Sequence, residues 1–105
     1  MTEGLAPTVQ ARFAALQRHF VAGLPARWLE LEAATTAATR QAVLHRLCGA
    51  AGSFGLERLS ASARAAEELA LAGSPEALAQ ALARLQLQIK LAQSSVRAGV
   101  APTPP

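Results

Sequence analysis

The stretch His45-Arg46-Leu47-Cys48-Gly49-Ala50-Ala51-Gly52-Ser53-Phe54-Gly55 combines a helical pattern of apolar residues with one histidine and three glycines. Read as a helix that begins shortly before His45, it forms one apolar stripe with spacings of four, three and four residues. The stripe consists of Val43, Leu47, Ala50 and Phe54. His45 lies two residues from Leu47, which is about 200° around the helix. We therefore expect its imidazole to face away from the core, toward solvent.

Two glycines lie on the histidine's side of this helix. Gly49 and Gly52 follow His45 at four and seven residues, so the helix turns next to the imidazole carry no side chain. Glycine in a helix interior costs about 1 kcal/mol relative to alanine. This cost is understandable if the backbone of another molecule, or a phosphate, comes close to the imidazole.

Amphipathic patterns predict two helices before this stretch. The first helix is expected to begin with Thr8 as its N-cap and to end at Gly23. Its predicted apolar stripe consists of Val9, Phe13, Leu16 and Phe20. The second helix opens at Leu24-Pro25 and is expected to stop near Thr35-Thr36. Its predicted apolar face consists of Leu24, Trp28 and Leu31, extended by Leu29.

Three helices are predicted from residue 39 onward. Thr39 is the candidate cap of the helix that carries His45, and Gly55 marks its break from the next. The fourth helix is expected to end at Gly73 in a left-handed cap, and Ser74-Pro75-Glu76 is a clear start signal for the fifth. The predicted core face of the fourth helix is Leu56, Leu59, Ala63, Ala66 and Ala70, supported by Leu69. The fifth helix shows a heptad-like seam of Leu78, Leu82, Leu85, Ile89, Ala92 and Val96.

Short connections between amphipathic helices favour antiparallel neighbours. We therefore predict an all-α fold in which helices two to five form an up-down-up-down four-helix bundle, with the first as an additional N-terminal helix that caps one end. The predicted domain covers residues 8–98, between a flexible N-terminus (1–7) and a disordered Pro-rich tail (99–105). Met1 and the Pro-rich tail suggest a complete short protein rather than a segment of a larger kinase.

Composition excludes several function classes. The 105 residues are enough for one domain, and an aromatic content of 4% argues for packed helices over a β-rich fold. The net charge is +3, but the basic residues are scattered, which argues against nucleic-acid binding. The chain contains no Asp and thus no phosphorylatable aspartate of its own. One cysteine, no membrane span and no signal peptide favour a cytoplasmic protein.

The run His-x-Leu-x-Gly-x-Ala-Gly-x-x-Gly-Leu-x-x-Leu, from His45 to Leu59, resembles the motif of histidine-containing phosphotransfer (HPt) domains of bacterial two-component phosphorelays. In that family the histidine accepts a phosphoryl group from a receiver-domain aspartate and passes it on. The resemblance implies that His45 is the phospho-accepting residue, that the chain has no ATP site, and that it is a phosphoryl carrier rather than an enzyme. Many members carry lysine three residues after the histidine, where this chain has Cys48.

Several residues are candidates for supporting the ring or the phosphate. Glu67 matches the place where some family members have a glutamine that orients the ring. A carboxylate there would hold the ring N–H but repel a phosphate, and a solvated acid beside Glu68 is an equal alternative. Arg46 or Arg64 is a candidate replacement for the missing lysine charge. Gly49 gives room beside the ring, and Cys48 is expected to be a small packing residue.

Partner docking is predicted for a second group of residues. If the first helix caps the bundle near His45, the candidates are Phe13, Leu16, Phe20 and Gly52. The alternative, which the apolar pattern favours, is that the three apolar side chains belong to the core. His19 is interpreted as a surface or boundary residue. Two histidines and one cysteine at unrelated spacings make no metal site.

The sequence thus predicts a monomeric phosphorelay carrier whose partners are receiver domains of a response regulator or hybrid sensor kinase. No cofactor is expected on this chain, because Mg²⁺ would reside on the partner receiver domain. The alternative function is a helical adaptor that binds a signalling partner without phosphotransfer, and Cys48 at the lysine position is its best support.

Overall fold

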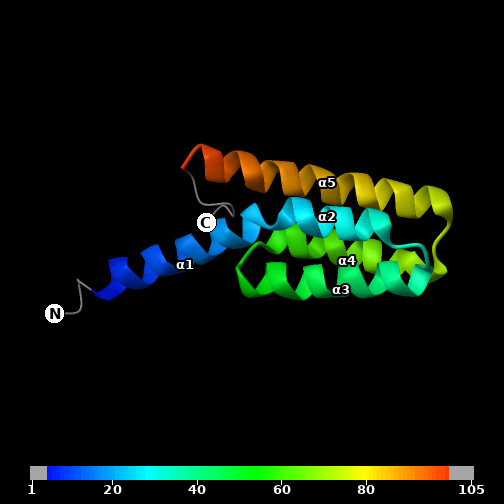
Figure 1. The fold of residues 1–105 in the computed structure, drawn as a ribbon, viewed down its shortest axis with the longest axis horizontal. Coiled ribbons are helices and arrows are strands. Elements are labelled where there is room, and N and C mark those ends of the chain that lie inside the picture. The colour runs from blue at the N-terminus through cyan, green and yellow to red at the C-terminus, as the bar shows by residue number, and fades with distance from the viewer. Residues whose placement is uncertain (1–4, 100–105) are drawn as a thin grey trace.

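The computed structural model of the chain describes residues 5–99, with side chains from Thr8 onward. These residues form five helices and contain no strand, which confirms the all-α prediction (Figure 1). The helices are α1 (Leu5–Ala22), α2 (Leu24–Ala33), α3 (Ala37–Ser53), α4 (Glu57–Ala72) and α5 (Pro75–Arg97). Within the described residues, no helix is both long enough and apolar enough to cross a membrane.

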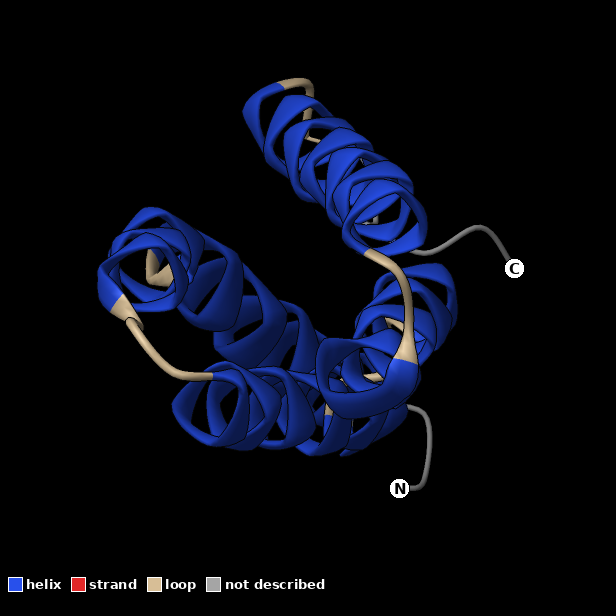
Figure 2. Ribbon diagram, turned by 90° about the vertical axis from the view of Figure 1, so that its right-hand side faces the viewer, coloured by secondary structure: helices blue, strands red, loops and turns tan. Residues whose placement is uncertain are grey.

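Helices α2 to α5 lie side by side and alternate in direction, as the prediction of an up-down-up-down bundle requires (Figures 1 and 2). The most extensive contact is between α3 and α4, followed by α4 and α5. Ala51, Ala63 and Ala66 are fully buried. Because side chains of this size allow backbones to approach closely, they explain why α3 and α4 pack so tightly.

The core is built mainly from leucine and alanine. Its largest fully buried side chains are Leu24, Leu44 and Leu85. The predicted face of α4 is confirmed, since all of its residues are buried except the supporting Leu69, which is half-buried. In α5 the buried positions are Ala81, Leu85, Ile89 and Ala92, and the remaining members of the predicted seam are half-buried. In α2 the predicted extension at Leu29 is wrong, because that side chain is 64% exposed.

The C-terminal half of α1 covers the end of the bundle at the α3–α4 turn. The Phe20 ring packs on Phe54 with a centroid distance of 5.1 Å. Gln17 is buried and donates from Nε2 to the carbonyl oxygen of Phe54 over 2.7 Å. This bond satisfies a carbonyl at the C-terminal end of α3, where intrahelical donors run out. Sequence reasoning missed this role of Gln17.

The predicted core stripe of α1 is mostly wrong. Val9, Phe13 and Leu16 are 63%, 41% and 53% exposed, and only Phe20 is buried. The reason is visible in Figure 1, where the N-terminal half of α1 extends beyond the bundle and has no neighbouring helix to pack on. An apolar helix face therefore remains in contact with solvent.

Two helix starts differ from the prediction. Helix α1 begins at Leu5, so Thr8 lies inside it, and the proline at position 7 falls in the first turn, where a missing N–H breaks no helical hydrogen bond. Of the segment predicted to be flexible, residues 1–4 lie outside the described residues, as do residues 100–105 of the predicted tail. In α3 the N-cap is Thr36, whose hydroxyl accepts from the N–H of Thr39 at 3.1 Å, so the prediction of Thr39 as the cap is wrong.

The other helix ends depend on glycine and serine. Gly55 has φ +73°, which confirms a break after α3 that only glycine adopts without strain. Ser74 caps α5 as predicted, accepting from Ala77 N–H. Gly73 is extended, with φ −84° and ψ 164°, so the predicted left-handed cap is wrong. The position favours glycine for another reason, since an added Cβ would lie 2.8 Å from Leu69 Cβ and 2.9 Å from the Leu69 carbonyl oxygen.

We expect Gly73→Ala to lower the free energy of unfolding by about 1–3 kcal/mol, because the new methyl group overlaps the last turn of α4. Urea denaturation followed by circular dichroism measures the change. Gly23→Ala is the matched control, since its nearest contact at 3.4 Å is ordinary and its φ is negative. Equal stability of the Gly73 variant and the wild type would contradict the steric explanation.

Candidate functional site

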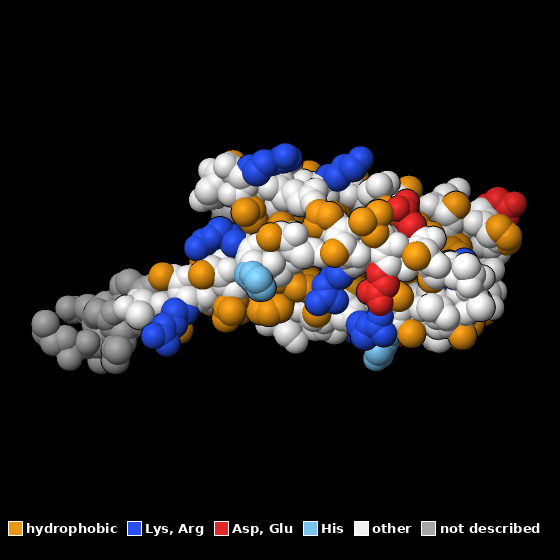
Figure 3. Space-filling view, viewed as in Figure 1, with side chains coloured by type: hydrophobic (Ala, Val, Ile, Leu, Met, Phe, Trp, Pro, Cys, Tyr) orange, Lys and Arg blue, Asp and Glu red, His pale blue; other side chains and the backbone are white. Residues whose placement is uncertain are grey.

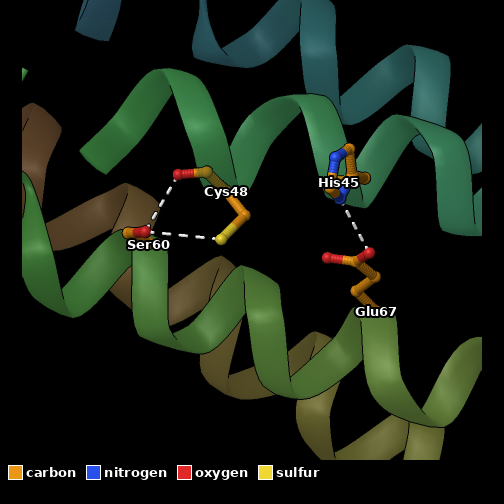
Figure 4. Close-up of polar contacts among 4 residues, drawn as sticks. All are labelled: His45, Cys48, Ser60 and Glu67. Carbon is orange, nitrogen blue, oxygen red and sulfur yellow. Dashed lines mark hydrogen bonds and ion pairs between the residues drawn. The ribbon is translucent and has the colours of Figure 1, made fainter. Parts of the chain in front are cut away.

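His45 projects from the solvent-facing side of α3, with its side chain 76% exposed. Its Nδ1 atom lies 2.9 Å from Oε2 of Glu67 on α4 (Figure 4). An ionised carboxylate only accepts hydrogen bonds, so Nδ1 carries the hydrogen and the lone pair of the neutral ring is on Nε2. Within the described residues, Nε2 makes no hydrogen bond. The ring is thus held at one nitrogen and open at the other.

The register between α3 and α4 brings this pair together. The helices are antiparallel, so one turn forward on α3, from His45 to Cys48, corresponds to one turn back on α4, from Glu67 to Arg64. A turn further along, the Ser60 hydroxyl donates to the Cys48 carbonyl oxygen at 2.9 Å and lies 3.4 Å from Cys48 Sγ. The sequence analysis left open whether Glu67 meets the ring or is a solvated acid, and the structure shows that it meets the ring.

An open groove of about 580 Å³ runs between α3 and α4 beside His45. It is lined by Gln41, His45, Cys48, Gly49, Arg64, Glu67, Glu68, Leu71 and Ala72. Sequence reasoning missed Gln41 and Leu71, although their distance of four residues from His45 and Glu67 already places them one turn away on the same faces. Cys48 is buried, which agrees with its interpretation as a packing residue.

Gly49 keeps one wall of the groove open. Apart from its chain neighbours and the backbone of its own helix, a Cβ atom added there would meet no atom within 4 Å. Gly52 differs, because its added Cβ would lie 3.4 Å from the Ser60 hydroxyl, and it lines a neighbouring depression rather than the His45 groove. The space beside the histidine therefore comes from Gly49, while Gly52 allows close contact between α3 and α4.

The two candidate arginines have different surroundings. Arg46 is directed toward α2, where its Nη2 atom lies 2.6 Å from Glu30 Oε2, and it does not line the groove. Arg64 does line the groove. The pKa of the Arg64 guanidinium is raised by its interaction with the Cys48 side chain and, to a smaller extent, by the carboxylates of Glu68 and Glu67. The charge near His45 is therefore that of Arg64, not that of its sequence neighbour.

The predicted docking residues do not line the groove. Phe20 is 6% exposed, so its side chain belongs to the core and is not available to a partner. Phe13 and Leu16 are exposed, and the Phe13 ring lies near Gly55 at the α3–α4 turn. Gly55 is ten residues from His45, or about 15 Å along a helix. Figure 3 shows apolar and basic side chains interspersed along α1, with basic side chains spread over several elements.

Among the described residues, no three His, Cys, Asp or Glu side chains lie close enough together to hold a metal ion. The groove carries two carboxylates, those of Glu67 and Glu68, and Glu67 is already bonded to the ring. Its chemistry is therefore that of an exposed imidazole nucleophile beside one guanidinium.

Comparison with known proteins identifies one family. The family model described as Hpt domain matches residues 7–95, which includes the His45 groove and all five helices apart from the ends of α1 and α5. No curated protein and no solved structure matches the chain.

We expect Gly49→Ala to raise the free energy of unfolding by about 0.5–1 kcal/mol, because alanine favours the helix and the new methyl group meets no atom. Urea denaturation measures the change. In Gly52→Ala, contact with Ser60 should reduce this gain. A loss of stability in the Gly49 variant would show that the glycine is needed by the fold itself.

Proposed function

The chain belongs to the Hpt domain family, and we propose that it relays a phosphoryl group between receiver-domain aspartates through Nε2 of His45. Hpt domains are phosphocarrier modules of two-component signalling and interact with receiver domains, so a role related to phosphotransfer follows from the family. The identity of the acceptor atom and the direction of the relay are the proposal.

The observation that carries the proposal is the contrast between the two ring nitrogens. Nδ1 is bonded to Glu67, whereas Nε2 points away from that bond and the ring is 76% exposed. A partner aspartyl phosphate can therefore approach the nitrogen that bears the lone pair. Gly49 carries no side chain on the neighbouring wall of the groove, which leaves room for that approach.

In the transfer step, the Nε2 lone pair attacks phosphorus and forms an N–P bond. The bond between phosphorus and the aspartyl oxygen breaks, and its electron pair remains on the partner's carboxylate. The ring keeps the hydrogen on Nδ1 and becomes an imidazolium, whose positive charge faces the Glu67 carboxylate 2.9 Å away. Fixed charges of this kind and correct positioning of the reactants account for most of the lowering of the barrier in phosphoryl transfer. Reversal of the same step delivers the group to another aspartate.

Glu67 has two opposed effects in this scheme. It orients the ring and stabilises the imidazolium, but its negative charge also repels the incoming phosphoryl group. The side chain is 19% exposed and its Oε2 atom is bonded to the ring, so the carboxylate is directed at Nδ1 rather than at the phosphate position beyond Nε2. We infer that orientation is the larger of the two effects.

The partner is proposed to supply what this chain lacks. A receiver domain would bring the aspartyl phosphate and the Mg²⁺ ion, and the exposed apolar residues Phe13 and Leu16 are proposed to contribute to its docking. We propose that the carrier acts as a monomer in the cytoplasm. The alternative, a helical adaptor without phosphotransfer, would need partner binding but no reactive His45.

We expect His45→Gln to abolish phosphorylation of this chain, because glutamine offers no nucleophilic nitrogen. Receiver domains encoded in the same genome, each phosphorylated with radiolabelled acetyl phosphate, are incubated with the chain, and label transfer is measured. His19→Gln is the matched control and should be labelled like the wild type, since His19 does not line the His45 groove. Equal labelling of the His45 variant and the wild type, or labelling of neither, would contradict the proposal.

Removal of the Glu67 carboxylate should shift the ring toward the tautomer that carries its hydrogen on Nε2. In that tautomer Nε2 has no lone pair with which to attack phosphorus. We therefore expect Glu67→Ala to lose the predominance of the Nδ1–H form and to be phosphorylated about tenfold more slowly. NMR of the imidazole nitrogens and the rate of label transfer measure the two effects. Glu68→Ala should preserve the wild-type tautomer, and an unchanged tautomer in the Glu67 variant would refute the orienting role.

A further inference from the structure

We propose that Arg64 is a catalytic residue that contacts the phosphoryl group on His45 and neutralises its charge. The inference rests on the proposed function, because it assigns a role at the same site. It names a cation on α4, outside the His45–Leu59 motif that identifies the site in the sequence.

The placement of Arg64 follows from the α3–α4 register. Arg64 precedes Glu67 by one turn on α4, and Glu67 is bonded to His45, so the guanidinium and the imidazole share one groove. Cys48, which follows His45 by one turn on α3, lines this groove together with Arg64. Arg64 therefore borders the same groove as the strip of α3 that carries the nucleophile.

A phosphoryl group in the groove would be stabilised by a positive charge. Glu67 and Glu68 both line the groove, and a phosphoryl group adds further negative charge. Of the described residues that line the groove, Arg64 is the one permanently charged cation. Cys48 contributes no positive charge, and Arg46, although adjacent to His45 in sequence, is bound to Glu30 on α2 and does not line the groove.

Arg64 is also available for a ligand. Its guanidinium is not within 4 Å of a carboxylate oxygen of any described residue, in contrast to that of Arg46. Arginine presents several N–H donors in a planar fork that matches phosphate oxygens, and it stays protonated throughout the range in which proteins are folded. The pKa of Arg64 is raised further, mainly by the Cys48 side chain and to a smaller extent by the carboxylates of Glu68 and Glu67.

During transfer, Arg64 donates N–H groups to the non-bridging phosphoryl oxygens while Nε2 of His45 replaces the leaving atom at phosphorus. No proton or electron is exchanged with Arg64. Charge neutralisation at these oxygens lowers the barrier in both directions, since the same oxygens carry negative charge in the transition state of the forward and the reverse step.

The experiment uses phosphoramidate, a small donor that needs no partner and therefore separates the chemistry from docking. Its P–N bond breaks, ammonia leaves, and the phosphoryl group forms the new bond to Nε2. The full chain is incubated with phosphoramidate, and the rate of N–P bond formation is measured by phosphorus NMR for the wild type, Arg64→Ala and Arg64→Lys. His45→Gln identifies the labelled site, and thermal melts report on folding.

We expect Arg64→Ala to slow phosphorylation of His45 by about 10- to 100-fold, with the melting temperature unchanged. Arg64→Lys should recover part of the rate, because it restores the charge but not the fork. Arg58→Ala removes an equal charge from an exposed position of α4 that does not line the groove, and should react like the wild type.

Wild-type rates in Arg64→Ala would overturn this inference and leave the proposed function standing. An equal loss of rate in Arg58→Ala would also overturn it, because net charge would then explain the effect. Failure of the wild type itself to be labelled at His45 would overturn the proposed function, and the role of Arg64 with it.

Discussion

The close packing of α3 against α4 is the constraint on which the His45 groove depends. Fully buried alanines lie on both helices, at position 51 of α3 and positions 63 and 66 of α4, and Gly52 of α3 faces Ser60 of α4. Because the buried side chains are closely packed, sliding α3 along α4 would create voids or overlaps, and the register of the two helices is fixed. The register fixed in this way places Glu67 beside the imidazole and Arg64 one turn away. A single packing interface therefore determines the geometry of the reactive group.

At the site, α3 and α4 are linked to each other, and the imidazole remains accessible from solvent. Cys48 and Ser60 tie the two helices together one turn from the histidine, with the Ser60 hydroxyl 2.9 Å from the Cys48 carbonyl oxygen. Next to this link, Gly49 leaves the groove open, and the imidazole is exposed to solvent. This division suits the proposed phosphoryl carrier, because a partner domain would have to reach Nε2 while the bond to Glu67 holds the other ring nitrogen.

The two arginines near His45 illustrate why sequence distance is a poor guide to electrostatics. Arg46 is the immediate neighbour of the histidine, yet successive residues of a helix point about 100° apart, and Arg46 forms an ion pair with Glu30 on α2. Arg64 is nineteen residues away and lines the same groove. A surface ion pair such as that of Arg46 contributes little to stability, but it directs the charge away from the nucleophile.

The sequence by itself determined the helices, most of their breaks and the outward orientation of His45, because helical periodicity and the φ requirement of Gly55 act within one segment. It also predicted Glu67 as a candidate without deciding its contact. Only the tertiary structure decided that contact, the groove position of Arg64, and the exposure of Val9, Phe13 and Leu16. Periodicity shows which residues share a helix face, but whether a face is covered, and by which residue, depends on the register and length of a neighbouring helix. The periodicity of α1 predicts a core stripe for this reason, although most of α1's N-terminal half extends past the end of the bundle.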